Sequence, residues 1–396
     1  MDHLQRFHRL TELLKAHRHW WQFVPFEQLS LPWLESAPAL CTWLANQPDE
    51  TLVALRQDLP TLHAELSPFL PFTVELGSLA AVDDSESREI RYPSRLDSGV
   101  PGRKWRQITA FASALHSDDQ PWLEWCAGKG HLGRVLAATS GRDVVSLEWQ
   151  QTLCEEGAML ASKSGQPQRF VQGDALAADA ASLLAGEQHA VALHACGELH
   201  LALMRHGAER RTRSISLSPC CYHLIPQDSY QPQSRAAQAT GLSLSKMDLK
   251  LPLQETVTAP PQVRRRRRLE LSYRLGFDSL QRSQGGSGYQ PLPTVPKAVL
   301  DQGFEAFCHW ACERKNLPLD LTRAGDFLEK GEVRVSLVEQ METVRQLFRR
   351  PLEIWLALDR VLFLEEQGYQ VSLTKFCERS ATPRNLLIQA TLSKAI

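Results

Sequence analysis

The chain has 396 residues, of which 43% are hydrophobic and 22% charged, and its formal net charge at pH 7 is -1. These values are ordinary for a globular protein of two or three domains. They exclude a basic surface spread over the whole molecule, so any nucleic-acid surface has to be local. No stretch approaches the roughly 18 uninterrupted apolar residues of a transmembrane helix. The charged N-terminus lacks the apolar core of a signal peptide, and nine cysteines, an odd number, indicate free thiols. We therefore expect a cytoplasmic protein.

Residues 1–80 are expected to form a helical region, because apolar residues such as Leu10 and Leu14 recur at helical spacing. Residues 81–102 are polar, contain Pro and Gly, and predict a linker or an ordered loop. An amphipathic helix is expected directly after this segment.

Residues 103–280 are expected to form a Rossmann-like α/β domain. Short apolar runs alternate there with stretches of helical pattern, and such alternation predicts a parallel, doubly wound sheet. The candidate strands are WLEWC (122–126), DVVSLEW (143–149), RFVQGDA (169–175), AVALHACG (190–197) and SISLSPCC (214–221).

The C-terminal region begins after a Gly/Ser/Pro-rich linker at residues 281–297 and is predicted to be mostly helical over residues 298–396. The run LEIWLALDRVLFLEEQG is expected to end as a helix at its glycine. The run SATPRNLL predicts a further helix, with Thr382 as its N-cap and Pro383 at its first position.

The stretch WLEWCAGKGHLGRVLA carries Gly128, Gly130 and Gly133 in a G-x-G-x-x-G pattern between a strand and a helix. Such a turn lets backbone N–H groups and a helix N-terminus approach a nucleotide-like ligand. His131 is expected to brace the turn. Glu148, at the end of the next strand, suits a ribose hydroxyl, and this contact fits a dinucleotide and S-adenosylmethionine equally well.

Two further carboxylates favour S-adenosylmethionine. Glu124, inside the first strand, is expected to point toward the ligand side of the turn, where it would repel a pyrophosphate and attract a sulfonium and an ammonium. Asp174, after the third strand, is placed to accept a hydrogen bond from an adenine amino group. Two interpretations compete with an S-adenosylmethionine site. In the first, the three carboxylates are simply solvated beside an ordinary strand–helix turn. In the second, the turn binds a dinucleotide and the protein is an NAD-dependent oxidoreductase.

The runs CAGKGHLGRVLA, LHACGEL and SPCCYHL, in this order, resemble the GKGH-type methyltransferase domain family, a group that includes methyltransferase-like protein 25. The resemblance covers roughly residues 103–224. A weaker similarity is found near the C-terminus in LDRVLFLEEQGY and SATPRNLL. It implies a class I methyltransferase with S-adenosylmethionine as cofactor. Cys126 stands where such turns usually begin with glycine. The cofactor-binding residues expected on this basis are Glu124, Cys126, Gly128, Gly130, Glu148, Asp174 and His194.

The methyl acceptor is expected at the carboxyl ends of the fourth and fifth strands, the edge at which open α/β sheets bind ligands. His194 and His223 are the candidate proton acceptors, since neutral imidazole accepts a proton near pH 7. Tyr222 is expected either to stack on a base or line the methyl pocket, or simply to pack. The Asn/Asp-Pro-Pro-aromatic clamp of many amino-group methyltransferases is missing from HACGEL.

Four cysteines lie at the carboxyl ends of the first, fourth and fifth candidate strands, and three interpretations compete for them: Cys126, Cys196, Cys220 and Cys221. With His194 or His223 they could hold a metal or an iron–sulfur cluster. Cys220 or Cys221 could be a covalent nucleophile for methylation of pyrimidine C5. The third interpretation, which we favour, is that the cysteines act as small apolar residues that line a pocket. We therefore expect no metal, and measurable activity in serine variants of Cys220 and Cys221.

The basic run RRRRRLELSYR supplies a possible RNA contact through Arg264, Arg265, Arg266, Arg267 and Arg268, against the alternative of a solvated face with paired arginines. Its pattern does not distinguish a strand from a helix. The preferred function is an S-adenosylmethionine-dependent methyltransferase acting on RNA, with protein as the next substrate class. A non-catalytic cofactor-binding assembly factor is the alternative from a different class.

Overall fold

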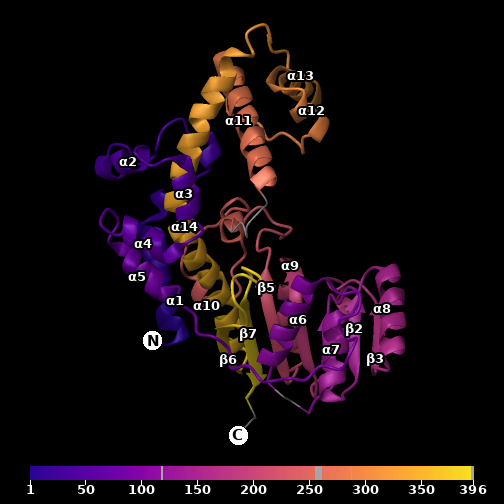
Figure 1. Cartoon of the computed structure of the whole chain (residues 1–396). Helices are drawn as coiled ribbons and strands as arrows, with labels where there is room; N and C mark the ends of the chain where they lie inside the picture. Colours follow the sequence, from indigo (N-terminus) through magenta and orange to yellow (C-terminus); the bar gives the residue numbers. More distant parts are fainter. Residues whose placement is uncertain (117–118, 255–260, 287, 394–396) are drawn as a thin grey trace. The chain divides into compact units, whose positions relative to one another are not determined.

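The computed structural model describes residues 1–116, 119–254, 261–286 and 288–393 (Figure 1), so residue 287 of the expected linker lies outside the described residues. The α-helices are α1 (His3–Ala16), α2 (Pro38–Ala45), α3 (Asp49–Leu55), α4 (Leu59–Leu66), α5 (Phe72–Leu79), α6 (Gly102–Ala114), α7 (His131–Ser140), α8 (Gln151–Ser164), α9 (Glu198–Glu209), α10 (Arg235–Gln238), α11 (Pro261–Ser283), α12 (Lys297–Asp301), α13 (Phe304–Lys315) and α14 (Asp326–Glu366). The strands are β1 (Trp122–Trp125), β2 (Val144–Glu148), β3 (Gln168–Gln172), β4 (His189–Cys196), β5 (Ser214–Cys220), β6 (Tyr369–Lys375) and β7 (Leu386–Leu392). Short 3-10 turns cover Arg18–Trp20, Pro25–Glu27, Ala178–Leu183 and Asp248–Leu253.

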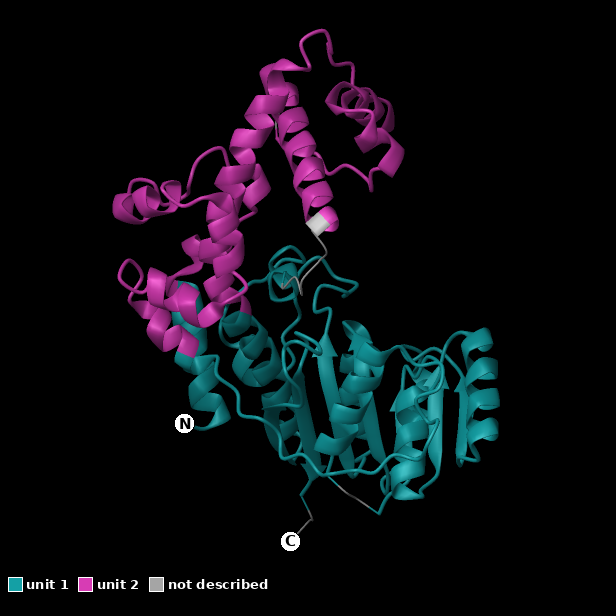
Figure 2. Ribbon diagram, viewed as in Figure 1, with its two compact units in different colours: residues 1–15, 78–257, 350–396 teal, residues 16–77, 258–349 magenta. Residues whose placement is uncertain are grey.

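The chain divides into two compact units, coloured teal and magenta in Figure 2. The first contains residues 1–15, 78–257 and 350–396, and the second contains residues 16–77 and 258–349. Each unit combines segments that are far apart in the sequence, so the units do not coincide with the continuous ranges expected from the sequence. The last part of the chain joins the sheet unit because two of its segments are strands, whereas α11 belongs to the helical unit.

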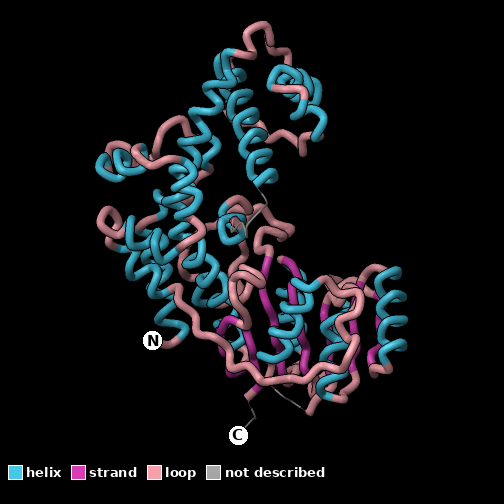
Figure 3. The backbone as a smooth tube through the Cα atoms, in the orientation of Figure 1, coloured by secondary structure: helices cyan, strands magenta, loops and turns pink. Residues whose placement is uncertain are grey.

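The first unit is an α/β sheet of seven strands in the order β3-β2-β1-β4-β5-β7-β6, which confirms the fold class. Strands β1 to β5 pair in parallel, and β7 runs antiparallel to both β5 and β6. Helices α7, α8 and α9 pack against the parallel strands that they connect (Figure 3). The strand order reverses between β1 and β4, so the loops after these strands diverge and leave room for a ligand at the carboxyl edge.

The prediction of a helix that begins at Thr382 and Pro383 is wrong, because the residues that follow form strand β7. Thr382 caps no helix: its hydroxyl accepts the Arg384 backbone N–H at 3.2 Å in a local turn. Residues 386–388 are fully buried between β5 and β6. Tertiary pairing on both sides of an apolar run overrides the local helix-start signal.

Helix α14 ends at Glu366 and is followed by Gly368 at φ 88°, which agrees with the expected helix end at this glycine. In the second unit, α11 resolves the open question about the arginine run in favour of a helix. Its C-terminal half packs Phe277 against Phe307 of α13. Among the described residues, no helix is both long and apolar enough to cross a membrane.

Candidate cofactor and acceptor site

The glycine turn between β1 and α7 has a left-handed backbone at three positions: Cys126 (φ 57°), Gly128 (φ 60°) and Gly130 (φ 61°). Glycine adopts this region freely, but a residue with a Cβ atom does so at a cost in free energy. A Cβ atom on Gly130 would also lie 2.3 Å from Nε2 of Gln168. The turn therefore requires glycine at Gly130, whereas Cys126 holds a strained conformation of the kind that gathers at functional sites.

Glu148, the last residue of β2, connects this strand to the glycine turn through its carboxylate. One carboxylate oxygen accepts the backbone N–H of Gly128 at 2.8 Å, and the other accepts that of Gln150 at 3.0 Å. Because each carboxylate oxygen has two lone pairs, the side chain retains capacity to accept ribose hydroxyls. The ribose-binding role of Glu148 stays a prediction.

Glu124 is oriented differently from the expectation. Its register partner on β2 is Ser146, whose hydroxyl donates to the carboxylate at 2.7 Å, and Gln168 of β3 donates at 3.4 Å. The Gly133 backbone N–H donates to it as well. Burial raises the pKa of Glu124 to about 7. Glu124 thus supports the turn from inside the protein, and it does not point to the ligand side as expected.

Asp174 follows β3 and is exposed, and its carboxylate accepts the Leu176 backbone N–H at 2.9 Å. Its adenine contact stays a prediction. His131, at the start of α7, is buried, and its Nδ1 lies 2.9 Å from an Arg134 guanidinium nitrogen. Burial and the surrounding cations together lower the pKa of His131 to about 4. This contact lies within α7, so the expected bracing of the turn by His131 stays a prediction.

His194 occupies an irregularity in β4. The register of β4 with β5 shifts between Leu193 and Cys196, and His194 has a left-handed φ of 65°. The amide nitrogen of Gln107 donates to the Ala381 carbonyl at 2.8 Å, so the amide oxygen, 3.0 Å from Nε2 of His194, accepts its proton. Nδ1 is left as the proton-accepting nitrogen. Burial lowers the pKa of His194, which keeps the imidazole neutral near pH 7.

His223 lies after β5 and is half-buried, and its Nδ1 has no hydrogen-bond partner among the described residues. Burial lowers the pKa of His223. Tyr222 is only 1% exposed, and its ring lies against the guanidinium of Arg360 at 4.9 Å. Tyr222 therefore packs in the interior, and the idea that it stacks on a base is wrong. Burial raises its pKa, so its hydroxyl stays protonated.

All nine cysteines are free thiols, as expected. Burial and the neighbouring carboxylates together raise the pKa of Cys126 to about 12. The Sγ atoms of Cys196, Cys220 and Cys221 lie within 4.8 Å of one another. Each of Cys196 and Cys220 donates toward Cys221, which lowers the pKa of the Cys221 thiol. The structure therefore brings together three of the four cysteines singled out from the sequence.

Two buried charged residues of α14, for which no role was expected, organise the loop after β5. Asp359 accepts the backbone N–H groups of Gln233 at 2.9 Å and Ser234 at 2.7 Å. Arg360 donates to the Tyr230 hydroxyl at 3.0 Å. The run LDRVLFLEEQGY, which contains both residues, was the available signal for this network.

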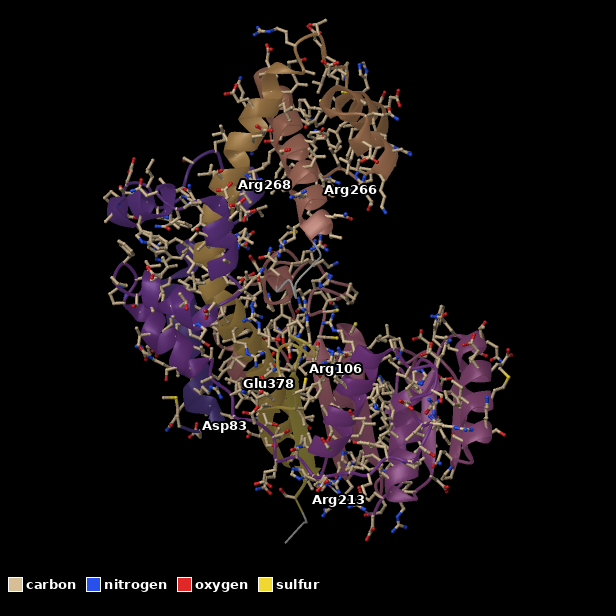
Figure 4. The ribbon with its side chains drawn as sticks, in the orientation of Figure 1. Asp83, Arg106, Arg213, Arg266, Arg268 and Glu378 are labelled. Carbon is tan, nitrogen blue, oxygen red and sulfur yellow. The ribbon has the colours of Figure 1, made fainter. Side chains whose placement is uncertain are left out.

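The arginine run occupies the exposed first turns of α11 in the second unit, where Figure 4 labels Arg266 and Arg268. Arg266 pairs with Asp301, and Arg268 pairs with Asp49 at 2.7 Å. The remaining members, Arg264, Arg265 and Arg267, are exposed and form no ion pair with another described residue.

Residues 103–228 match the model of a family described as a methyltransferase domain. This part of the chain is therefore similar to a methyltransferase domain. The matched range begins in α6 and ends in the loop that follows β5. It therefore includes the glycine turn between β1 and α7, Glu148 and the carboxyl edge of the parallel strands.

Solved methyltransferases are similar to the chain at low identity. The tRNA (uracil-54, C5)-methyltransferase of Pyrococcus abyssi, in complex with S-adenosyl-L-homocysteine, is 15% identical with a TM-score of 0.24, and the match covers 28% of this chain and 27% of that one. The magnesium protoporphyrin IX methyltransferase of Synechocystis PCC 6803 is 12% identical with a TM-score of 0.27, covering 87% and 100%. The chain thus spans about a quarter of the length of the first protein. Similarity at this level does not identify a substrate.

Proposed function

We propose that the protein is a cytoplasmic enzyme of the GKGH type that transfers the methyl group of S-adenosylmethionine to RNA. The observation that carries the proposal is the hydrogen bond that the Gly128 backbone N–H donates to Glu148, which joins the carboxylate expected to bind the ribose to the glycine turn. The free state of all nine cysteines supports a reducing compartment.

Methyl transfer requires an acceptor atom aligned with the methyl carbon and the departing sulfur. The acceptor attacks the methyl carbon, the carbon–sulfur bond breaks, and S-adenosylhomocysteine leaves with both electrons. Positioning supplies most of the rate acceleration in such a displacement. A proton that the acceptor loses goes to the free imidazole nitrogen of His194 or to Nδ1 of His223, the two candidates at the carboxyl edge of β4 and β5.

The RNA part of the proposal is supported by the unpaired arginines of α11. Arg264, Arg265 and Arg267 are exposed, and their charges are not neutralised by an ion pair to another described residue. Phosphate groups attract such a cluster, and the release of condensed counterions supplies much of the binding free energy. The overall charge of -1 makes this local cluster the candidate contact.

A methyl-transfer assay tests the proposal directly. RNA and protein fractions from cells that lack the gene are incubated with purified enzyme and S-adenosylmethionine that carries a labelled methyl group. We expect label in RNA with the wild type and none with Glu148→Ala, followed by identification of the methylated nucleoside by mass spectrometry. Label in protein alone would exclude RNA as the substrate. Absence of label from both fractions, with S-adenosylhomocysteine still bound, would favour a non-catalytic cofactor-binding factor.

A further inference from the structure

Three thiols gather where β4 and β5 end. The Sγ atoms of Cys196 and Cys220 are 3.4 Å apart, and all three Sγ atoms, including that of Cys221, lie within 4.8 Å of one another. Cys220 is 3% exposed, whereas Cys196 and Cys221 are half-buried. The cluster is therefore sheltered on one side and accessible on the other.

The backbone itself produces this arrangement. Leu193 pairs with Ser218, but after the irregularity at His194 the register shifts by one residue, so that Cys196 pairs with Cys220. Without the shift, Cys196 would stand opposite Cys221. Residues at one register position of neighbouring parallel strands point to the same face of the sheet, about 4.8 Å apart. The bulge therefore places the first two thiols side by side.

Two features of the following turn bring in the third thiol. Cys221 has a left-handed φ of 48°, which reverses the chain directly after β5. The turn is closed by the Leu224 backbone N–H, which donates to the Cys221 carbonyl at 2.9 Å, and by the Glu198 N–H, which donates to the Leu224 carbonyl at 3.0 Å. The three thiols are thus positioned by backbone hydrogen bonds and by a strained residue, in a segment where strain is expected to serve a purpose.

Three converging thiols form a soft ligand set. Thiolate sulfur selects zinc and similar thiophilic ions over magnesium or calcium. Zinc with three protein ligands keeps a fourth position for water or a substrate atom, whereas structural sites fill all four positions. Thiolate is the form that binds a metal, so metal binding at this cluster would release thiol protons.

We propose that Cys196, Cys220 and Cys221 bind one thiophilic divalent cation, with Zn²⁺ as its representative, and leave a fourth coordination position open. This site departs from the expectation that the cysteines only line a pocket. That expectation rested on the lack of a paired C-x₂-C motif, but here the ligands converge from two strands and a turn. The inference is independent of the RNA substrate, since metal binding is measured without turnover.

The test is a metal titration of the full chain, purified with a reductant and stripped with a chelator. We expect one equivalent of Zn²⁺ to bind by calorimetry, and Co²⁺ to give the intense near-ultraviolet absorption of thiolate-to-metal charge transfer. Cys196→Ser, Cys220→Ser and Cys221→Ser should each weaken Zn²⁺ binding by about tenfold or more and reduce the Co²⁺–thiolate band.

Cys377→Ser is the matched control, because Cys377 is also a half-buried free cysteine in the same unit but lies outside the cluster. It should bind Zn²⁺ like the wild type. Circular dichroism and S-adenosylhomocysteine binding verify that each variant is folded. The proposal is overturned if the reduced wild type binds Zn²⁺ no more tightly than Cys220→Ser, or if the control loses binding equally. It is also overturned if the fully reduced protein binds no Co²⁺ through thiolate and the cluster only forms a disulfide on oxidation.

Discussion

The Glu148 carboxylate and the Gly128 backbone N–H are joined by a hydrogen bond of 2.8 Å that links the end of β2 to the cofactor turn. We expect Glu148→Ala to weaken S-adenosylhomocysteine binding by about 1.5–3 kcal/mol, because the carboxylate proposed to bind the ribose is lost and the turn loses its anchor. Titration calorimetry measures this change, and NAD should give no binding heat with the wild type.

Glu155→Ala is the control for this variant, since Glu155 is an exposed carboxylate on neighbouring α8. It should bind S-adenosylhomocysteine like the wild type. Detectable NAD binding without S-adenosylhomocysteine binding would contradict the assignment of the cofactor.

Glu124 makes the stability of the domain depend on pH. Its pKa is raised by burial from 4.5 to about 7, so the folded state binds the proton more tightly than the unfolded state. The stabilisation is fully present below pH 4.5 and is lost as the pH rises to about 7. The loss amounts to roughly 3 kcal/mol at about 1.4 kcal/mol for each pKa unit.

Glu124→Gln should remove this dependence, because a neutral amide has no proton to release. Urea unfolding at several pH values between 4.5 and 8 measures the free energy of unfolding for both proteins. The difference between variant and wild type should shift in favour of Gln as the pH rises, and exposed Glu187→Gln should show no such trend. Parallel curves for the wild type and Glu124→Gln would disprove the prediction.

Gly197 allows the turn after β5 to approach the start of α9. It has a left-handed φ of 57°, and a Cβ atom there would lie 2.0 Å from the Leu224 carbonyl oxygen. We expect Gly197→Ala to destabilise the protein by about 2 kcal/mol or more, because the clash and the backbone strain add. Gly186→Ala, at a position with open space and no left-handed backbone, should change the unfolding midpoint little. Equal midpoints for the two variants would contradict the assigned role.

Tyr222 is interpreted as a packing residue, and its phenol oxygen is buried without a partner among the described residues. Tyr222→Phe should therefore keep methyl-transfer activity and thermal stability. Tyr222→Ala should lower the free energy of unfolding by about 3–5 kcal/mol, since it leaves a large cavity. Thermal unfolding and the labelled-methyl assay measure both effects. A large loss of activity in a stable Tyr222→Phe protein would restore a role for the hydroxyl in the reaction.

The exposed arginines of α11 supply a prediction about RNA affinity. Replacing Arg264, Arg265 and Arg267 by alanine should weaken RNA binding and reduce the slope of log affinity against log salt by about 2 to 3, because fewer counterions are released. Fluorescence anisotropy at several salt concentrations measures this slope.

A second triple variant replaces Arg9, Arg142 and Arg323 by alanine. It removes the same charge from arginines that are at least partly exposed and that pair with nearby carboxylates. Its slope should stay close to that of the wild type. Equal slopes for the two triple variants would show that the α11 arginines are not the contact.

The sequence alone was sufficient for features that depend on local pattern. The alternation of apolar runs and helices predicted the parallel strands, and the glycines between β1 and α7 marked the turn, because a left-handed backbone next to a packed strand tolerates few other residues. The carboxylate of Glu148 was found because its distance from the turn along the chain follows from one helix and one strand.

The tertiary structure decided what depends on partners distant in the chain. Residues 386–392 form a strand because β5 and β6 pair with them, although Thr382 and Pro383 resemble a helix start. Glu124 points inward because Ser146 lies at its register position. Cys196 meets Cys220 because of a one-residue register shift in β4. Register and side-chain direction are collective properties of paired strands, so composition and spacing cannot specify them.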